Sequence, residues 1–378
     1  MPNPPTLEPP GRLVSLDVLR GLTIAAMILV NNNGDSRFAY SPLLHSPWNG
    51  WTPTDIIFPA FLFMVGLSMA FSFPPRLAAA DSRMSLLPRI LRRTLILILL
   101  GLLVNSFPFF HLHDIRLYGV LQRIALCYFF TSLLLIWSTT WSRAVVAFVA
   151  LLGYWLMLRY LSVPGFGVPV RDIPFLDPYK NIVAYLDRLL LPGHLYGDGT
   201  YDPEGLLSTL PAVATTLFGV FTGEWLRAKW TNSTKAAGIL VAGFTAILAG
   251  EAWSFWFPIN KRLWTSSYVL LAAGITLVCL AVLFWLIDCA GWKNGWTLPW
   301  LAFGTNAITL YIFSELLAST LDSWHTSSGI TLKQSIFSRI AHWVPDLSLA
   351  SLLYSIAFVI VCAVPAWWMY GRKIFVKI

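Results

Sequence analysis

The first histidine of the chain, His45, lies in the segment LLHSPWNGWTPTDIIFP, between two long apolar runs. A neutral imidazole near pH 7 is the usual general base of an enzyme. Trp48 and Trp51 can bury such a ring, and Asp55 can orient it as the acid does in a catalytic triad. The segment therefore predicts a catalytic pair of His45 and Asp55, against the plainer interpretation that a loop histidine is solvated or packed.

Asp55 also has a purely structural interpretation. Thr52 is a good helix N-cap, Pro53 fits the first helical position, and Asp55 falls at the third. This spacing predicts a capping box and a favourable charge at the start of a helix. The structural and the functional interpretation of Asp55 carry equal weight in the sequence.

The apolar run before His45 carries further polar groups. Asp17 and Arg20 lie three residues apart in SLDVLRG, a spacing that brings both to one face of a helix. They form either a self-neutralising ion pair or a cationic corner that receives an anionic ligand. Asn31 is the deepest of three consecutive asparagines at the end of the run, and its amide can cap the helix or hold a carbonyl or an amine.

Three more charged residues are candidates for a site. Arg123 lies in GVLQRIALCYFF, where a buried guanidinium needs a carboxylate partner or a water-filled cavity. Asp202 and Glu204 in YDPEG precede an apolar run, where acids suit a helix N-terminus or contact a ligand. The HLHD stretch at 111–114 has the residue types of a metal site but no clear third ligand, so we predict no metal.

Membrane-spanning helices must position these groups. Of the 378 residues, 57% are hydrophobic and only 12% charged, whereas about a quarter of the residues of soluble domains are charged. Several apolar runs approach the length that crosses about 30 Å of hydrocarbon. We therefore predict an all-α, polytopic transmembrane helical bundle of about ten spans, near residues 14–33, 54–73, 90–107, 116–137, 144–161, 207–227, 236–254, 264–287, 298–320 and 349–370.

The distribution of charge predicts the orientation of this bundle. The net charge of +8 does not indicate a nucleic-acid partner, because the basic residues cluster at the ends of the spans. An even number of spans puts both termini on one side. Lys and Arg are more numerous in the loops of that side, so both termini are predicted to be cytoplasmic. His45 is then extracytoplasmic.

The chain is predicted to form one domain. Residues 1–11 are a polar, Pro-rich leader without a cleavage signal, and residues 12–378 form a single transmembrane domain. The loop region near 162–206 is extracytoplasmic in this orientation. Because it is long and interrupted by aromatic residues, it is expected to be an ordered cap. The four cysteines lack the spacing of a metal site, and disulfides are not expected.

Five blocks of sequence have a familiar order: RLVSLDVLRGLTIAAMILVNN, HSPWNGWTPTDIIFPAFLFMVG, GVLQRIALCYF, YDPEGLLSTLP and FPINKRLWTSSYVL. Together they resemble the heparan-α-glucosaminide N-acetyltransferase family, including its bacterial NagX-type members. The H-x-x-W-N-G-x-T-x-x-D-x-x-F-P pattern in the second block is specific. The likeness covers most of residues 12–320 and is weakest over the final span.

The resemblance implies a membrane acyltransferase. In such an enzyme, acetyl-CoA on the cytoplasmic side gives its acetyl group to the amine of a glucosamine-like amino sugar on the other side. Acetyl-CoA is thus the expected co-substrate and the lipid bilayer the expected environment. The bacterial inner membrane is the expected location, and a homodimer is the expected assembly.

The resemblance also implies roles for individual residues. The family's functional histidine falls on His45 and its partner asparagine on Asn31, although Asn32 or Asn33 can fill the same role because the connecting segment is longer here. The basic residues that meet CoA fall on Arg20, beside Asp17, and on Arg123. For the acceptor sugar, we assign Trp48, Asn49, Asp202 and Glu204.

A secondary transporter of amino sugars is the rival interpretation. Ten spans and acidic residues within them suit such a protein, and Glu224, Glu251 and Glu315 are expected to be buried acids of this kind. Against it, the sequence shows no internal repeat and no pair of matching interrupted helices. A transporter moves sugar without acetyl-CoA, whereas an acetyltransferase consumes acetyl-CoA.

Overall fold

The computed structural model describes residues 13–327 and 329–376, which form thirteen α-helices and no β-strand. The predicted leader, residues 1–11, lies outside the described residues. The helices are α1 (Val14–Asn31), α2 (Pro53–Ala78), α3 (Leu87–Ser106), α4 (Val120–Trp137), α5 (Thr140–Tyr160), α6 (Ile182–Leu190), α7 (Thr209–Arg227), α8 (Asn232–Ser254), α9 (Ser266–Leu283), α10 (Thr297–Thr305), α11 (Ala307–Ser323), α12 (Leu332–Trp343) and α13 (Leu347–Gly371). A short π-helical segment, Phe284–Cys289, extends α9. The predicted all-helical fold is confirmed.

Each of the ten predicted spans coincides with one of these helices or with a pair of them. Among the described residues, seven helices are long and apolar enough to cross a membrane, and the number is eight if the bent pair α10–α11 is counted as one span. The two remaining spans, α3 and α7, are less apolar, since α3 begins with three arginines and α7 carries four threonines and a glutamate. Their membrane crossing stays a prediction.

The sequence predicted a span over 298–320, and the structure divides this stretch into the two helices α10 and α11. The chain bends by 81° between α10 and α11, at Asn306. The bend is stable because the buried Asn306 side chain binds the chain's C-terminal segment, accepting from the amide of Val376 at 3.0 Å and donating to the Ile374 carbonyl at 2.9 Å.

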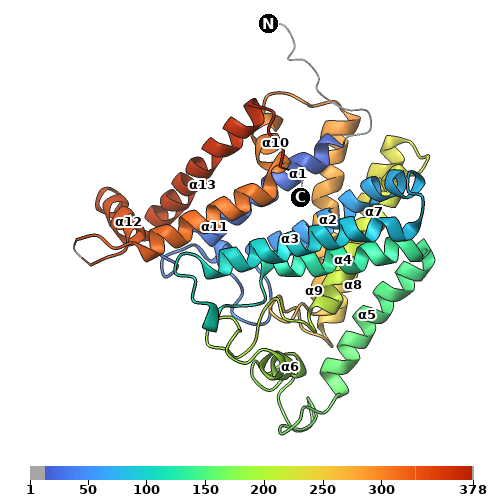
Figure 1. The fold of residues 1–378 in the computed structure, drawn as a ribbon, viewed down its shortest axis with the longest axis horizontal. Coiled ribbons are helices and arrows are strands. Elements are labelled where there is room, and N and C mark those ends of the chain that lie inside the picture. Colours follow the sequence, from blue (N-terminus) through green and yellow to red (C-terminus); the bar gives the residue numbers. More distant parts are fainter. Residues whose placement is uncertain (1–12, 328, 377–378) are drawn as a thin grey trace, which may run out of the picture.

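Helices α2 and α7 cross very closely at the centre of the bundle (Figure 1). A Cβ atom on Gly66 would lie 1.8 Å from the Thr216 carbonyl oxygen, and one on Gly219 would lie 1.9 Å from that of Phe63. Only glycine fits these two positions, as at the small-residue contacts of membrane helices. The crossing fixes α2, whose first turn carries Asp55.

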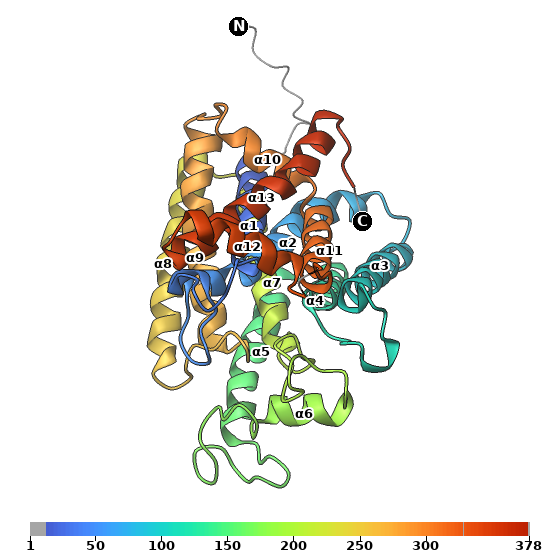
Figure 2. The same cartoon turned by 90° about the vertical axis from the view of Figure 1, so that its left-hand side faces the viewer.

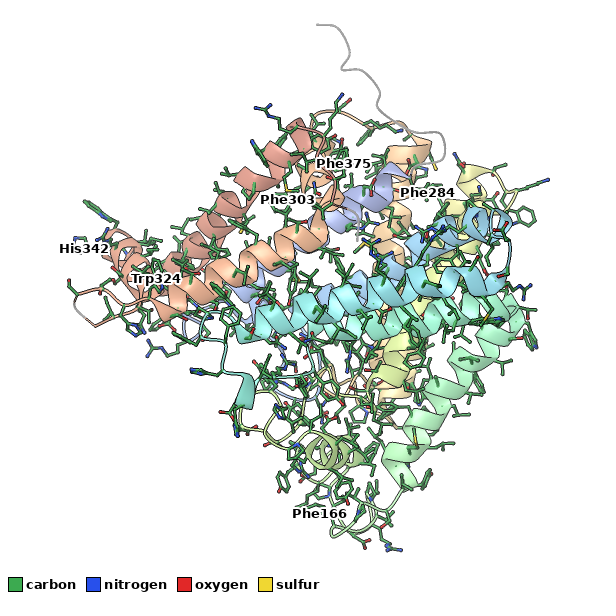
Figure 3. The ribbon with its side chains drawn as sticks, in the orientation of Figure 1. Phe166, Phe284, Phe303, Trp324, His342 and Phe375 are labelled. Carbon is green, nitrogen blue, oxygen red and sulfur yellow. The ribbon has the colours of Figure 1, made fainter. Side chains whose placement is uncertain are left out.

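Residues 161–208 form an ordered cap at one end of the bundle (Figure 2). The cap contains α6 and packs on an apolar cluster that includes Tyr154, Val163 and Phe257. Figure 3 shows Phe166, in this cap, at the opposite end of the molecule from Phe284 and Phe375. Val376 lines the same cavity as Arg20 of α1, so both described ends of the chain lie away from the cap.

Candidate active site

His45 and Asp55 meet where the loop 32–52 joins the first turn of α2. His45 Nδ1 lies 2.8 Å from Asp55 Oδ1. Asp55 is fully buried, whereas the His45 side chain is 43% exposed. One ring nitrogen is therefore held by a carboxylate, and the ring remains accessible, which is the arrangement of a general base with its orienting acid.

The second oxygen of Asp55 serves the predicted capping box. Asp55 Oδ2 accepts from the backbone amides of Thr52 and Ser46, both at 3.0 Å, and from the Thr52 hydroxyl at 3.2 Å. The capping box predicted from the sequence is confirmed. The structural and the functional interpretation of Asp55 are thus compatible, because each uses a different oxygen.

Lys261 completes this group, and the residue-by-residue sequence analysis missed it. Its Nζ lies 2.8 Å from His45 Nδ1, 3.3 Å from His45 Nε2 and 3.4 Å from Asp55 Oδ1. The Lys261 side chain is 16% exposed, and burial lowers its pKa despite the nearby Asp55. The sequence feature that could have indicated this residue is its place in the block FPINKRLWTSSYVL, where the lysine lies in the short loop between two predicted spans.

Two loops far apart in the sequence are joined at this point. The Gly50 amide donates to the Ile259 carbonyl at 2.8 Å, and the Asn260 side chain donates to Asn49 Oδ1 at 3.1 Å. Gly50 has a φ of +94°, which favours glycine at this turn. These bonds bring Lys261 to His45. Asn49, assigned to the acceptor from the sequence, is placed here as a link between the loops.

Trp48 connects the His45 loop to the cap. Its indole Nε1 donates to the Leu176 carbonyl at 2.9 Å, and its ring meets Tyr201 edge-on at 5.3 Å between centroids. The hydroxyl of Tyr201 accepts from Arg262 at 3.1 Å. The cap is thus tied to both loops of the site.

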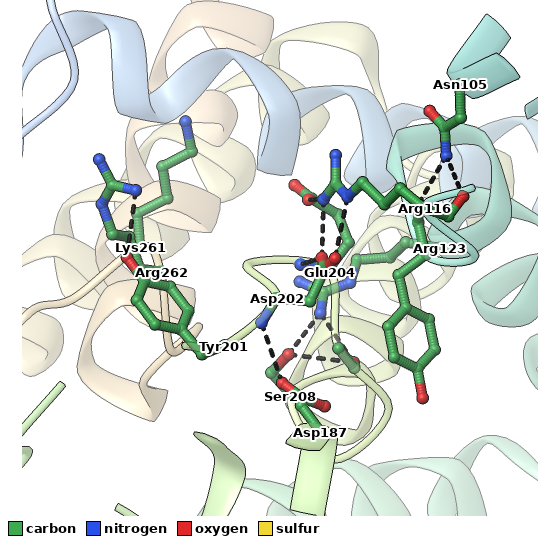
Figure 4. Close-up of polar contacts among 12 residues, drawn as sticks. Asn105, Arg116, Arg123, Asp187, Tyr201, Asp202, Glu204, Ser208, Lys261 and Arg262 are labelled. Carbon is green, nitrogen blue, oxygen red and sulfur yellow. Dashed lines mark hydrogen bonds and ion pairs between the residues drawn. The ribbon is translucent and has the colours of Figure 1, made fainter. Parts of the chain in front are cut away.

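Asp202 and Glu204 are both bound to Arg116 (Figure 4). Arg116 Nε and Nη2 lie 2.8 and 2.7 Å from the two oxygens of Asp202, and Nη2 also binds Glu204. Asp202 is fully buried, so this bidentate pair stabilises the segment that leads into α7. The sequence did not indicate this partner, which lies 86 residues away.

Among the described residues Arg123 forms no ion pair with a carboxylate, which was one of the two surroundings predicted from the sequence, the other being a water-filled cavity. Its guanidinium donates to the Gly205 carbonyl at 3.0 Å and to the Ser208 hydroxyl (Figure 4). It also stacks over the Trp264 ring at 5.0 Å. Burial raises the pKa of Asp187 to about 6, and the nearby positive charge of Arg123 opposes this rise. Arg123 is placed beside the cap, and no described contact joins it to Arg20.

Asn31 lies at the end of α1 and faces α11. Its side-chain amide is 3.5 Å from Glu315 Oε1, and no described contact joins it to His45. Asn32 and Asn33 are buried and bond to carbonyls of their own helix, Ile28 and Val30. Asn31 is therefore the one of the three whose side chain is exposed towards a neighbouring helix.

A second polar region lies at the opposite end of α1 and α2. The predicted pair is present, with Arg20 Nη1 2.8 Å from Asp17 Oδ1, and Arg20 also donates to Ser68 at 2.8 Å. Arg20, Arg76 and Arg93 line a cavity of about 290 Å³. Arg76 and Arg93 also line a neighbouring cavity of about 400 Å³, together with Arg89 and Arg92. The two cavities form one cationic region.

The remaining expected acids differ in their surroundings. Glu224 pairs with Arg143, whereas Glu251 is exposed on α8, so the prediction that Glu251 is buried is wrong. Helix α8 packs mainly against α9, and Glu251 lies on its exposed side. Among residues 13–327 and 329–376, no three or more His, Cys, Asp or Glu side chains are arranged to hold a metal ion.

Comparisons with known proteins agree with the motifs. A family model described as "Heparan-alpha-glucosaminide N-acetyltransferase, catalytic" matches residues 12–257. The heparan-alpha-glucosaminide N-acetyltransferase of Mus musculus is 28% identical over 425 residues, and that of Homo sapiens is 27% identical over 402. These alignments cover 97% and 91% of this chain but 61% and 59% of the relatives. The chain thus spans about three fifths of the length of these two proteins.

Proposed function

Because the chain belongs to the heparan-alpha-glucosaminide N-acetyltransferase catalytic family, we propose that it transfers the acetyl group of acetyl-CoA to the amine of an amino sugar within the membrane. The observation that carries this proposal is the contact of His45 with Asp55 and Lys261, at the opposite end of α2 from a cationic region. The first region suits proton transfer and the second suits a polyanion.

The cationic region is the proposed site for the phosphates of CoA. Arg76, Arg89, Arg92 and Arg93 have no carboxylate partner among the described residues, and their charges face two adjoining cavities. Guanidinium groups bind phosphates through paired hydrogen bonds. The phosphates make CoA a polyanion, and moving them into hydrocarbon would be costly. The phosphates therefore stay in the cationic region, and only the acetyl-bearing arm enters the bundle.

The arm would follow α2 towards Asp55. Ser68, which binds Arg20, lies 13 residues along the helix from Asp55, or about 20 Å at 1.5 Å per residue. Phe61 lines both the Arg20 cavity and a narrow apolar gap that continues to Phe58 and Tyr311. The gap holds only about 10 Å³, so Phe61 must move before the arm can pass.

At the other end, His45 is the proposed general base. With Nδ1 held by Asp55, Nε2 can take a proton from the acceptor amine while the amine nitrogen attacks the thioester carbonyl. The carbon–sulfur bond then breaks, and the CoA thiolate takes up a proton. We favour this direct transfer over an acetyl-imidazole intermediate, because an acyl group on the exposed His45 ring would meet water.

The acceptor is proposed to be glucosamine or a related amino sugar. Trp48 and Tyr201 place aromatic rings beside the His45 loop, and the exposed amide of Asn31 faces Glu315. Apolar ring faces and a few fixed polar groups are the usual elements of such sites. The roles of Trp48, Asn49, Asp202 and Glu204 in binding the sugar and of Asn31 in catalysis stay predictions, as do the homodimer and the bacterial inner membrane.

We propose that the His45 loop faces away from the cytoplasm. A cysteine at the exposed Ser36 tests this orientation, in a background where the exposed Cys279 is replaced by serine. An impermeant maleimide added to intact cells should label Ser36→Cys. Labelling only after the cells are opened would invert the proposed orientation.

The bend at Asn306 favours one alternative, a secondary transporter of amino sugars. Interrupted helices line the substrate sites of many transporters. Such folds carry them in matched pairs, whereas the bent pair α10–α11 is the one broken span found among the described residues. Uptake of labelled glucosamine into vesicles that lack acetyl-CoA would support this alternative.

The deciding experiment mixes the purified protein in nanodiscs with acetyl-CoA and glucosamine. Mass spectrometry should detect free CoA and N-acetylglucosamine in equal amounts. His45→Ala should abolish both products, and His325→Ala, at an exposed loop histidine, should not. Unchanged thermal midpoints show that both variants are folded. Normal turnover by His45→Ala would remove His45 from the chemistry.

A further inference from the structure

Lys261 brings a primary amine to the place where the acceptor amine must react. Its Nζ is within 2.8 and 3.3 Å of the two ring nitrogens of His45. An acceptor amine needs contact of this kind, because a general base works within hydrogen-bond reach of the proton that it removes. The chemical group on Lys261 is the same as that on the proposed sugar.

The surroundings of Lys261 favour its neutral form more than those of a surface lysine. Burial lowers its pKa, although Asp55 and Glu204 attract the proton, and Arg262 beside it repels one. The neutral amine is the nucleophile in acyl transfer. Lys261 therefore combines contact with a base and a larger neutral fraction, two conditions that no other lysine of the described residues is shown to meet.

We propose that Lys261 is itself an acetyl acceptor, so that the protein acetylates its own active site when no sugar occupies it. This inference rests on the proposed acetyltransferase function. The Nζ nitrogen attacks the thioester carbonyl, a carbon–nitrogen bond forms and the carbon–sulfur bond breaks. His45 takes the proton released from Nζ, and the CoA thiolate leaves and is protonated. The products are acetyl-lysine and free CoA.

Acetylation of Lys261 has a direct structural consequence. An acetyl-lysine carries no charge, so the buried Asp55 loses the cation that lies 3.4 Å from its Oδ1. The amide is also larger than the amine and fills space beside the His45 ring. The modified protein is therefore inactive, and a bound sugar protects it by taking the acetyl group first.

The test uses the full-length protein in nanodiscs with isotope-labelled acetyl-CoA and no sugar. Peptide mass spectrometry follows the acetylation of Lys261 and of Lys229, an exposed lysine that reports the uncatalysed reaction. Lys261 should react at least about a hundredfold faster than Lys229, the lower end of what a positioned general base contributes. Equal rates at the two lysines would overturn the proposal.

Two further measurements connect the reaction to the site. His45→Gln should slow the acetylation of Lys261 to the rate at Lys229. If Lys261 is labelled as fast in this variant as in the unmodified protein, the role of His45 is refuted. Saturating glucosamine should suppress the labelling of Lys261 in the unmodified protein, which needs no variant. If the protein forms N-acetylglucosamine when glucosamine is present, but Lys261 stays unlabelled when glucosamine is absent, self-acetylation is refuted and the proposed function stands. If neither product forms, both are refuted.

Discussion

Replacing Asp55 by asparagine perturbs the contacts of His45 with almost no change of shape. Three donors converge on Asp55 Oδ2, namely the amides of Ser46 and Thr52 and the Thr52 hydroxyl. The amide oxygen of Asp55→Asn must therefore occupy this side. Its NH₂ group then replaces Oδ1 and faces both His45 Nδ1 and Lys261 Nζ.

The reversal has two calculable effects. A donor opposite Nδ1 forces the proton of the ring onto Nε2, so His45 can no longer accept a proton there. The corresponding reversal in a serine-protease triad lowers kcat by about 10⁴-fold, and we expect a loss of similar size. Lys261 also loses its buried counter-ion, and breaking such a pair costs about 3–5 kcal/mol of stability. We expect the lower value, about 3 kcal/mol, because Lys261 can lose its proton and become neutral.

The assay is the formation of N-acetylglucosamine, combined with the thermal midpoint in nanodiscs. The double variant Asp55→Asn, Lys261→Met should regain stability without regaining activity, because no unpaired charge remains. Asp35→Asn is the matched control, since Asp35 pairs with the exposed Arg37 and its loss should cost less than about 1 kcal/mol. Turnover of Asp55→Asn within tenfold of the unmodified protein would refute the tautomer argument.

Three other perturbations have defined outcomes. Arg116→Met leaves the buried Asp202 unpaired and should cost about 3–5 kcal/mol of stability. Arg171→Met, at an exposed pair, should leave the thermal midpoint nearly unchanged, and equal thermal midpoints of the two variants would contradict this. Burial raises the pKa of Asp187 from 3.8 to about 6, so the folded protein binds this proton more tightly than the unfolded chain does. The protonated carboxyl therefore contributes up to about 3 kcal/mol of stability below about pH 4, and this contribution is lost as the pH rises through 6. Chemical denaturation should show Asp187→Asn gaining on the unmodified protein between pH 4 and 7, and a pH-independent difference would count against the assignment. Arg20→Ala should weaken acetyl-CoA binding by about ten- to a hundredfold, the loss of one charge-assisted hydrogen bond, in a calorimetric titration where the exposed Arg37→Ala is the control; an unchanged affinity would remove Arg20 from the site.

Local patterns were sufficient to predict much of this molecule. The pairs Asp17–Arg20 and Thr52–Asp55 each lie within one helical turn, so their spacing alone determines their contact. The contact of His45 with Asp55 follows from a short loop leading into a capped helix. The helix positions followed from the lengths of the apolar runs.

The parts that the sequence did not predict depend on distant contacts. Lys261 and His45 are 216 residues apart, and one of the two bonds that join their loops is between backbone groups, which have no signature in the sequence. Arg116 likewise meets Asp202 across 86 residues. The bend at Asn306 depends on the C-terminal segment, which supplies its hydrogen-bond partners only in the folded chain.

The division of the site between two distant loops has a consequence for biogenesis. During synthesis α2 enters the membrane long before the loop that carries Lys261 has left the ribosome. Until then Asp55 has His45, Ser46 and Thr52 as partners but lacks the cation of Lys261. The charge of Asp55 therefore gains its lysine counter-ion only late in synthesis, when the α8–α9 hairpin delivers Lys261. A nascent or truncated chain that ends before this hairpin contains His45 and Asp55 but lacks Lys261.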